Sequence, residues 1–314
     1  MTELVNVAGA GLAGLLAGNM LRNRLGTMVE AQPSLPNNHS AVLRFRSRMV
    51  SDTLNIPFRE VMAMRAIVPW RNPVADMLSY SLKTTGVATL RSSITADGEI
   101  VKRYIAPLDL IEQMARPLQI VYDKSIINLL TSSLEDTWEK NQNSLTPIIS
   151  TIPMDKLMEI LHYPRRNKIE FHYRSGVNIV AELEGVDAYC SLYVSDPDYK
   201  FARITLTGAQ MVMECYGDIK AKEYWINDGK YLLGLDHCEI LSCKIQEQTY
   251  AKILPIDEDE RRRFIMWASD QHRIFSFGRF AVWRPGLLLD DLVQDFRVIM
   301  RLIDRGNQYD FVKG

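Results

Sequence analysis

A glycine-rich turn near the start of the chain constrains the fold more than any other feature. Residues 4–8 (LVNVA) are typical of a strand, the turn Gly9-Ala10-Gly11-Leu12-Ala13-Gly14 follows at once, and residues 15–25 are typical of a helix. Gly9 permits a tight turn, Gly11 lets a pyrophosphate approach the backbone, and Gly14 lets the helix pack closely on the strand. The unpaired N–H groups at the helix start would bind phosphate. This order of elements predicts a Rossmann-type dinucleotide-binding unit.

An acidic residue at the expected distance supports this interpretation. Residues 27–29 are typical of a second strand, which ends at Glu30, 21 residues after Gly9. A carboxylate at this place accepts hydrogen bonds from ribose hydroxyls. The alternative is a glycine turn that only packs a helix on a sheet.

Composition limits the class of protein. The chain has 314 residues, of which 47% are hydrophobic and 24% charged, so we expect a folded protein with about two domains. Its formal net charge of −1 lacks the basic surplus typical of proteins that bind duplex DNA. Four cysteines do not suggest a disulfide framework. We see neither a membrane span nor a signal peptide and therefore expect a cytoplasmic location, which is the host cytoplasm if the protein is viral.

The N-terminal fingerprint resembles that of the glutathione-reductase-like FAD superfamily. The resemblance implies an α/β fold in which a discontinuous Rossmann-type FAD-binding domain (1–60, 105–160 and 250–314) joins an antiparallel β-sheet substrate domain (61–104 and 161–249). It also implies a strand over 122–129, where a backbone group near Ile126 meets the adenine. Residues 146–153 then correspond to the strand and turn that leave the cofactor domain.

The C-terminal part has a matching pattern. Residues 274–277 are typical of a strand, Gly278-Arg279 breaks it, and Pro285-Gly286 opens a helix expected to run to about Arg305. In the resembling flavoproteins this helix start faces the flavin; the alternative is a plain amphipathic helix. The FAD contacts expected in total are Gly9, Gly11, Leu12, Ala13, Gly14, Glu30, Arg46, Ile126, Gly278, Arg279, Gly286, Leu287 and Leu288.

The remaining chain would cover the flavin face. Strands are expected over 168–173, 188–194, 201–206, 211–216 and 249–254, which together suggest an antiparallel sheet. Residues 193–205 resemble a strand-turn-strand of UDP-galactopyranose mutases, and Gly278-Arg279 resembles a pair in the same family. The uridine- and diphosphate-binding residues of that family are not recognisable here.

Charged and reactive side chains supply the candidate substrate contacts. Residues 39–71 contain six arginines but only two acids, Asp52 and Glu60. Arg44 and Arg46 would lie on one side of a strand, and we expect Arg44 to bind a substrate anion; a solvated face with a contact to the FAD pyrophosphate is the alternative. The candidate catalytic residues are His237, Arg203 and Tyr199. No metal is expected, because His237, Cys238 and Cys243 lack further ligands.

A single GxGxxG indicates that electrons come from the substrate rather than from a nicotinamide domain, which favours oxidation of an amine or amino acid. The chain also resembles the FAD-dependent enzymes of phage thymidine hypermodification. That resemblance implies oxidative cleavage of glycyl-methyl-uracil to aminomethyl-uracil in DNA, a step that would protect viral DNA from host restriction. A sugar-nucleotide mutase, an oxidase of small amines and a non-catalytic FAD-binding protein remain alternatives.

Overall fold

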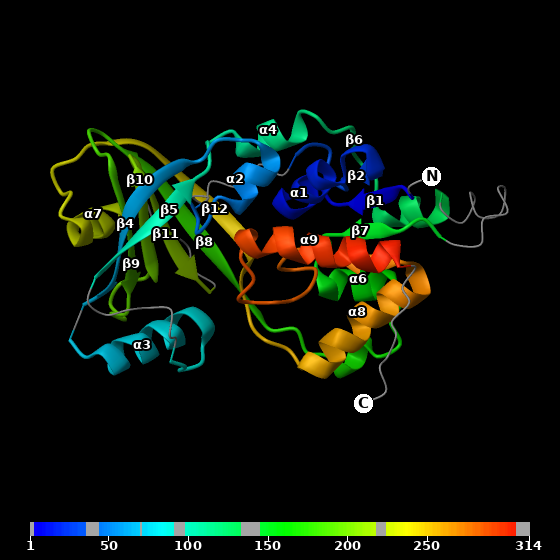
Figure 1. Ribbon diagram of the computed structural model, residues 1–314. Coiled ribbons are helices and arrows are strands. Elements are labelled where there is room, and N and C mark those ends of the chain that lie inside the picture. Colours follow the sequence, from blue (N-terminus) through cyan, green and yellow to red (C-terminus); the bar gives the residue numbers. More distant parts are fainter. Residues whose placement is uncertain are drawn as a thin grey trace.

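The chain folds into two lobes, each built on its own sheet (Figure 1). The computed structural model describes residues 3–35, 44–69, 71–90, 98–132, 145–217 and 224–305. One lobe holds a five-stranded parallel sheet and the other an eight-stranded mixed sheet. The predicted α/β fold class, with a Rossmann-type unit beside a sheet domain, is confirmed.

The parallel sheet is assembled from distant parts of the chain. Its strands, in spatial order, are β13 (Ile274–Ser276), β7 (Ile148–Ser150), β1 (Val5–Ala8), β2 (Leu25–Val29) and β6 (Ile120–Val121). All neighbouring pairs run parallel, which requires a crossover between them. The unit is therefore discontinuous in sequence, as the superfamily resemblance implied, although its outer limits in the chain stay a prediction.

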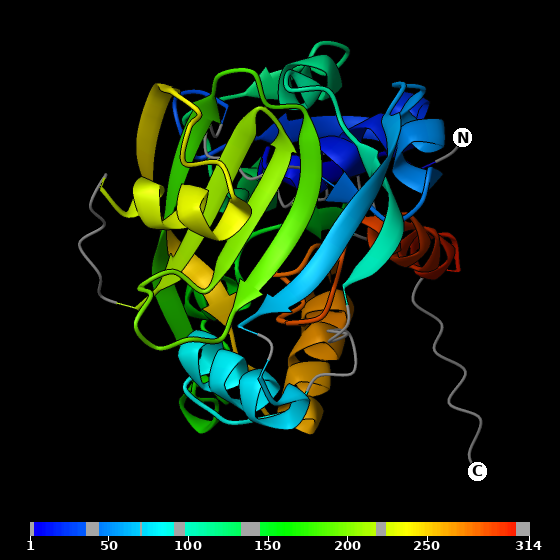
Figure 2. The same cartoon turned by 90° about the vertical axis from the view of Figure 1, so that its left-hand side faces the viewer.

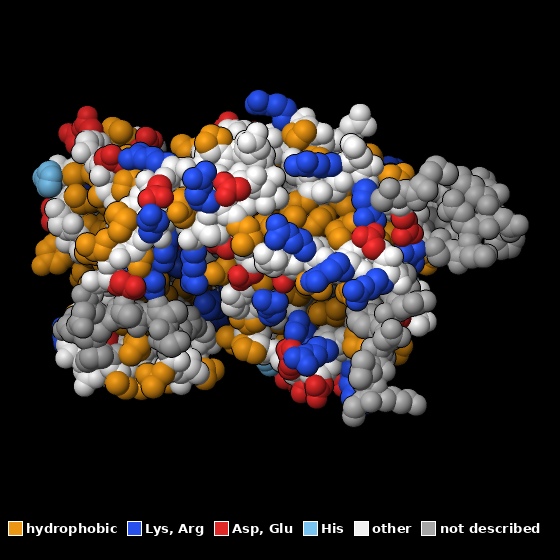
Figure 3. All heavy atoms as spheres, viewed as in Figure 1, with side chains coloured by type: hydrophobic (Ala, Val, Ile, Leu, Met, Phe, Trp, Pro, Cys, Tyr) orange, Lys and Arg blue, Asp and Glu red, His pale blue; other side chains and the backbone are white. Residues whose placement is uncertain are grey.

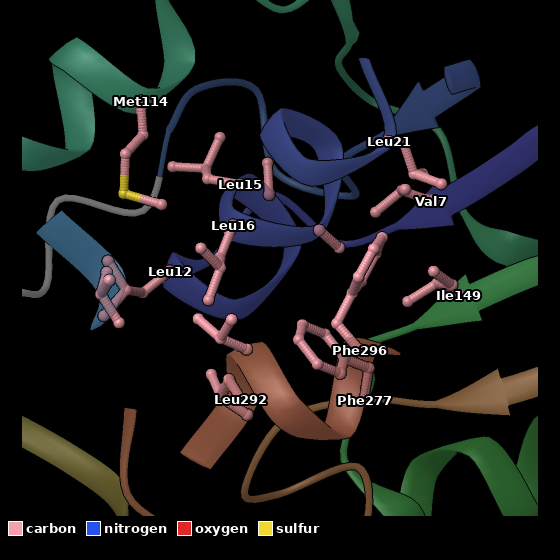
Figure 4. Packing of buried hydrophobic residues seen from close by; sticks show 14 of the residues in the cluster. Val7, Leu12, Leu15, Leu16, Leu21, Met114, Ile149, Phe277, Leu292 and Phe296 are labelled. Carbon is pink, nitrogen blue, oxygen red and sulfur yellow. The ribbon is translucent and has the colours of Figure 1, made fainter. Parts of the chain in front are cut away.

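Helices cover both faces of this sheet because its side chains alternate between two cores. Val7 and Ile149 point into one core, whereas the adjacent Ala8 and Ile148 point into the other. The first core is closed by α1 (Leu12–Leu21), α2 (Met49–Leu54), α4 (Leu110–Ala115) and α9 (Leu289–Asp304). Figure 4 shows how side chains of α1, α4 and α9 meet in it. The second is closed by α6 (Met154–Ile160) and α8 (Glu258–His272). Short 3₁₀ turns, η1 (Arg22–Arg24) and η2 (Arg166–Lys168), complete the connections.

The eight-stranded sheet forms the second lobe. In spatial order it contains β12 (Ile240–Ile253), β8 (Tyr173–Leu183), β11 (Gln210–Tyr216), β10 (Arg203–Gly208), β9 (Ala188–Val194), β4 (Arg59–Val68), β5 (Glu99–Ile105) and β3 (Arg44–Phe45). Neighbours are antiparallel except β4 and β9, which run parallel, so the expectation of an antiparallel sheet misses this one pairing.

The two faces of the eight-stranded sheet differ in polarity. Leu192, Ile204 and Met213 belong to an apolar face that packs against α7 (Trp225–Leu233). Figure 2 shows α7 (yellow) in front of the sheet, on the side turned away from the parallel sheet. The other face, called the inner face below, looks toward the parallel sheet, and α3 (Pro73–Thr85) closes one end of it through Tyr80, which packs on Tyr193.

Several expected elements differ in extent. The strand expected over 249–254 is the last part of β12, which begins at Ile240, and the helix expected over 15–25 is α1, which ends at Leu21 before η1. Instead of a strand over 122–129, β6 ends at Val121 and residues 126–132 are helical, because Ile126 and Leu129 have helical spacing and are both buried. Residues 166–168 form η2, and the strand expected over 168–173 begins only at Tyr173. The last helix begins at Leu289 rather than at Pro285-Gly286, because the Asp291 carboxylate accepts the Leu288 N–H at 2.9 Å and caps the helix there.

Candidate functional site

The carboxyl ends of the parallel strands meet along one edge of the sheet. Ser276, Ser150 and Ala8 are register neighbours, and Ala8 is in turn paired with Val29. The glycine turn and Glu30 follow directly from β1 and β2. In open α/β sheets, ligands bind in the crevice outside this edge. We call it the carboxyl edge.

The glycine turn combines positions that the protein fills with one that it leaves open. A Cβ on Gly14 would lie 1.8 Å from the Gly9 carbonyl oxygen, so the start of α1 approaches β1 as closely as the fingerprint predicts. Gly9 itself has φ +100°, a conformation that favours glycine. A Cβ on Gly11, by contrast, would meet no described atom within 4 Å. The space above Gly11 is therefore available to a ligand.

Phosphate-binding groups face that space. α1 starts at Leu12 without a side-chain cap, so the N–H groups of its first turn point outward from the helix start. The Ala10 N–H donates to Glu30 Oε2 at 2.6 Å, which fixes the turn against β2. This arrangement fits the pyrophosphate of a dinucleotide.

Glu30 is held with acceptor capacity to spare. The side chain is 8% exposed, and its second oxygen, Oε1, accepts the Gln32 N–H at 2.9 Å. An ionised carboxylate has about four acceptor sites, of which these two bonds use half. The other two sites suit the two hydroxyls of a ribose.

The C-terminal fingerprint lies next to the N-terminal one. Gly278 has φ +100°, and a Cβ built on it would lie 2.9 Å from the Cβ of Ala13. The turn after β13 thus packs on the first turn of α1 and carries Arg279 toward the second lobe. On β13, the Ser276 hydroxyl is buried and has no hydrogen-bond partner among the described residues. A buried polar atom of this kind normally has a partner, so the edge fits a bound polar ligand.

The other residues expected to contact the cofactor differ in burial and in their hydrogen bonds. Ile126 is buried inside the second core, and Leu287 is buried in the first. Leu288 donates its N–H to Asp291, whereas Gly286 is exposed with no described atom near its Cβ position. Arg46 is exposed and donates its backbone N–H to Asp290 at 3.0 Å. The role of these residues toward a cofactor stays a prediction.

Arg203 lies on the inner face, opposite the carboxyl edge. It is the register partner of Glu214 on β11 and forms an ion pair with that carboxylate, which also accepts the Tyr216 hydroxyl at 2.8 Å. Arg279 reaches the same place from the other lobe: its pKa is lowered by burial and is affected by the charges of Tyr216, Arg203 and Glu214. The Nε atoms of Arg203 and Arg279 are buried and have no partner among the described residues. Two guanidinium groups with unpartnered Nε atoms are a chemical arrangement that can bind an anion.

Arg44 also lies on the inner face but serves mainly to hold the sheet in its curve. From β3 its guanidinium donates to the Thr207 and Ser191 hydroxyls and, through Nη2, to the carbonyls of Cys190 and Leu206 at 2.8 and 2.6 Å. Burial lowers its pKa to about 10. Four of its five N–H groups are thus engaged, which leaves one N–H on Nη1 for the substrate anion that the sequence analysis assigned to it.

The other two catalytic candidates are on the opposite face of the sheet. His237 is exposed in the turn between α7 and β12. Tyr199 packs with the apolar outer core, and its pKa is raised by burial and by carboxylates that include Asp228 of α7. Of the three candidates, the structure brings only Arg203 to the side that faces the carboxyl edge.

Sequence reasoning did not single out Glu214, Tyr216 or Ser276. A signal for the first two was present: β11 has polar side chains at Gln210, Glu214 and Tyr216, all of one parity, between apolar residues. Because successive side chains point to opposite faces, this alternation indicates a polar face that must pair with something other than a hydrophobic core. Ser276 shows no such signal, because only the tertiary structure buries it.

No protein-family model matches this sequence, and a search of the curated proteins finds no match either. Solved structures do match. A reduced UDP-galactopyranose mutase superposes with a TM-score of 0.69 at 13% identity, over 97% of this chain and 94% of that chain. A geranylgeranyl bacteriochlorophyll reductase-like protein from Thermoplasma acidophilum superposes with a TM-score of 0.55 at 11% identity, over 97% of this chain and 79% of that chain. A Pyrococcus furiosus protein superposes with a TM-score of 0.54 at 12% sequence identity, over 99% of both chains. At these identities the likeness shows the fold alone, which this chain shares with these three solved structures.

Proposed function

We propose that the carboxyl edge holds FAD and that the protein is an FAD-dependent oxidoreductase. Glu30 would accept the ribose hydroxyls, Gly11 and the start of α1 would bind the pyrophosphate, and the Ser276 hydroxyl would find its partner on the cofactor. The open space at Gly11 supports this assignment, because the protein's own packing does not require glycine there, whereas a pyrophosphate held against the backbone would.

We further propose the substrate: an amino-acid-modified thymine base in phage DNA, as the family resemblance implies. One observation supports it most. Arg203 and Arg279 come from different lobes, converge between them, and each keep a buried Nε without a partner among the described residues. A carboxylate bound by these two groups would lie on the inner face, opposite the cofactor edge.

The proposed reaction is an oxidation followed by hydrolysis. In the glycyl substituent, base–CH2–NH–CH2–COO⁻, the Cα carbon would lose a hydride, for which bound FAD would be the acceptor, and the nitrogen would lose its proton to water. The product is the imine base–CH2–N=CH–COO⁻. Water adds to its carbon, the C–N bond breaks, and base–CH2–NH2 and glyoxylate leave. The chemistry that FAD would supply when bound is that of a two-electron acceptor.

The chain's own residues would position this substrate. Glu214 holds Arg203 through an ion pair, and Tyr216 holds Glu214 through its hydroxyl, so the Arg203 guanidinium is fixed before the substrate binds. Anchoring the carboxylate restricts rotation about the Cα and thereby directs one C–H bond toward the cofactor. Arg203 acts here as a binding residue.

A single-turnover experiment tests the proposal. The FAD-loaded protein is mixed without oxygen with single-stranded DNA that contains glycyl-methyl-uracil, and the products are quantified by mass spectrometry. We expect one glyoxylate and one aminomethyl-uracil for each FAD reduced. Release of intact glycine, or no change in the DNA, would contradict the reaction. Arg203→Gln should slow flavin reduction at low substrate concentration, whereas the exposed α9 residue Arg297→Gln serves as the control.

A sugar-nucleotide mutase activity is the second candidate. It is favoured by the superposition on UDP-galactopyranose mutase along nearly the full length of both chains. Its diphosphate would use the same arginines that we assign to the carboxylate. Dithionite-reduced protein incubated with UDP-galactopyranose distinguishes the two: ring isomerisation would support the mutase, and its absence together with glyoxylate formation would support the oxidation. Equal flavin reduction by free amino acids would instead indicate an oxidase of small amines.

A further inference from the structure

A second pair of arginines lies apart from Arg203 and Arg279. Arg103 is on β5, where it is the register partner of Val61, a buried inner-face residue of β4. Arg46 follows β3, the edge strand beside β5. Neither side chain forms an ion pair with any described residue, and among the described residues the Arg103 guanidinium donates, from Nη1, to the backbone oxygen of Lys102. Figure 3 shows Lys and Arg side chains gathered beside β5, at the hollow between the two lobes.

The two guanidinium groups are close enough to repel each other. Burial lowers the pKa of Arg103, and the positive charges of Arg65 and Arg46 lower it further; Tyr193 and Glu99 act in the opposite direction. Arg65 has its own partner, since its Nη1 is 3.6 Å from Glu99 Oε2. Arg103 is thus partly desolvated beside the exposed Arg46, and neither guanidinium forms an ion pair with a described carboxylate, so an incoming anion would stabilise the two charges.

The surroundings limit the size of that anion. Beyond Arg46 the surface forms a groove of about 450 Å³, which Asp290, Asp291 and Asp295 line together with Arg284. Three carboxylates would repel a second phosphate placed there. On the other side, Arg44 is engaged with the sheet and separates the pair from Arg203. The position therefore suits a single phosphate group.

We propose that Arg46 and Arg103 bind one phosphodiester of a single-stranded nucleic acid, the one beside the base that enters the site. This inference rests on the proposed function, since it places the modified base at Arg203 and its backbone at Arg103. It implies that the enzyme acts on a nucleotide within a strand rather than on a free nucleoside.

Equilibrium binding of an unmodified, fluorescently labelled thymidine oligonucleotide tests the site without catalysis. Arg103→Gln and Arg46→Gln should each weaken binding about tenfold and lower the slope of log Kd against log salt by about 0.7, the value for one phosphate on a single strand. The double variant should lose no further slope, because both arginines meet the same phosphate. Arg103→Lys should restore the slope, and Arg297→Gln, an exposed arginine on α9, should bind as the unaltered protein does.

The outcomes separate the possible sources of the phosphate. Unchanged oligonucleotide binding in both Arg46→Gln and Arg103→Gln overturns the proposal, as does an equal loss in Arg297→Gln. Weaker binding of UDP but not of the oligonucleotide would assign the pair to a sugar-nucleotide diphosphate and overturn it as well. Because Arg46 is exposed, its variant remains informative if Arg103→Gln fails to fold. Failure of DNA to reduce the flavin would contradict the proposed function and leave this binding result standing.

Discussion

Two alanine substitutions in the glycine turn should have opposite consequences. Gly11 has φ −68° and ψ 176°, which alanine adopts without strain, and no described atom lies within 4 Å of its Cβ position. Gly14, one turn into the helix, would place a Cβ 1.8 Å from the carbonyl oxygen of Gly9. We expect Gly11→Ala to fold normally but to lose FAD, and Gly14→Ala to lose stability.

The magnitudes follow from these contacts. In Gly11→Ala, the lower entropy of the unfolded chain stabilises by about 0.4–1 kcal/mol, and alanine at the N-cap destabilises by a similar amount, so the free energy of unfolding should change by less than about 1 kcal/mol. The added methyl group occupies the path of the pyrophosphate and should weaken FAD binding about 10- to 100-fold, or about 1.4–2.8 kcal/mol. In Gly14→Ala the backbone of the turn must move, which should cost at least about 3 kcal/mol.

Denaturant unfolding of the FAD-free protein and titration with FAD, followed by quenching of flavin fluorescence, measure the two effects separately. Gly11→Ala with unchanged FAD affinity would refute the placement of the pyrophosphate. Gly11→Ala as unstable as Gly14→Ala would show that the protein itself, rather than a ligand, fills the space at Gly11.

Other residues give further expectations. Glu30→Gln should weaken FAD binding about tenfold in the same titration, because an amide accepts fewer of the ribose and backbone hydrogen bonds; wild-type affinity would contradict the ribose role. Arg44→Met should lower the free energy of unfolding by about 3 kcal/mol in a urea titration, since it removes four hydrogen bonds. Burial lowers the pKa of Lys83 from 10.5 to about 8, so the folded chain releases this proton at lower pH than the unfolded chain. The stability of the protein relative to Lys83→Met should therefore rise between pH 8 and 10.5, and a flat difference would contradict the shift.

Features that depend on adjacent residues could be predicted from the sequence. The strand-turn-helix at Gly9 to Gly14 and the strands that became β7 and β13 are local patterns of apolar runs and glycines. The position of Glu30 directly after β2 could be predicted in the same way. Each lies in the structure within a few residues of its expected place.

Features that depend on contacts between residues far apart in the chain could not be predicted from the sequence. The β-type composition of residues 122–129 indicated a strand, although the spacing of Ile126 and Leu129 also fits a helix. The segment is helical because this spacing buries both side chains in the second core. Whether a side chain on the eight-stranded sheet faces the cofactor edge depends on its place in the pleat, which separates Arg203 on β10 from the adjacent Ile204 in the outer core. Arg103 joins the site only because the sheet curves, and no local pattern encodes that curvature.

The anaerobic visible spectrum of the purified protein tests the central claim most directly. We expect the absorption of oxidised flavin in the protein as purified or after reconstitution with FAD, and loss of that absorption on adding single-stranded DNA with glycyl-methyl-uracil, at one modified base per flavin. DNA with unmodified thymine should leave the spectrum unchanged. A protein that cannot be loaded with FAD would contradict the cofactor assignment, and a flavin that stays oxidised with the modified DNA would contradict the proposed reaction.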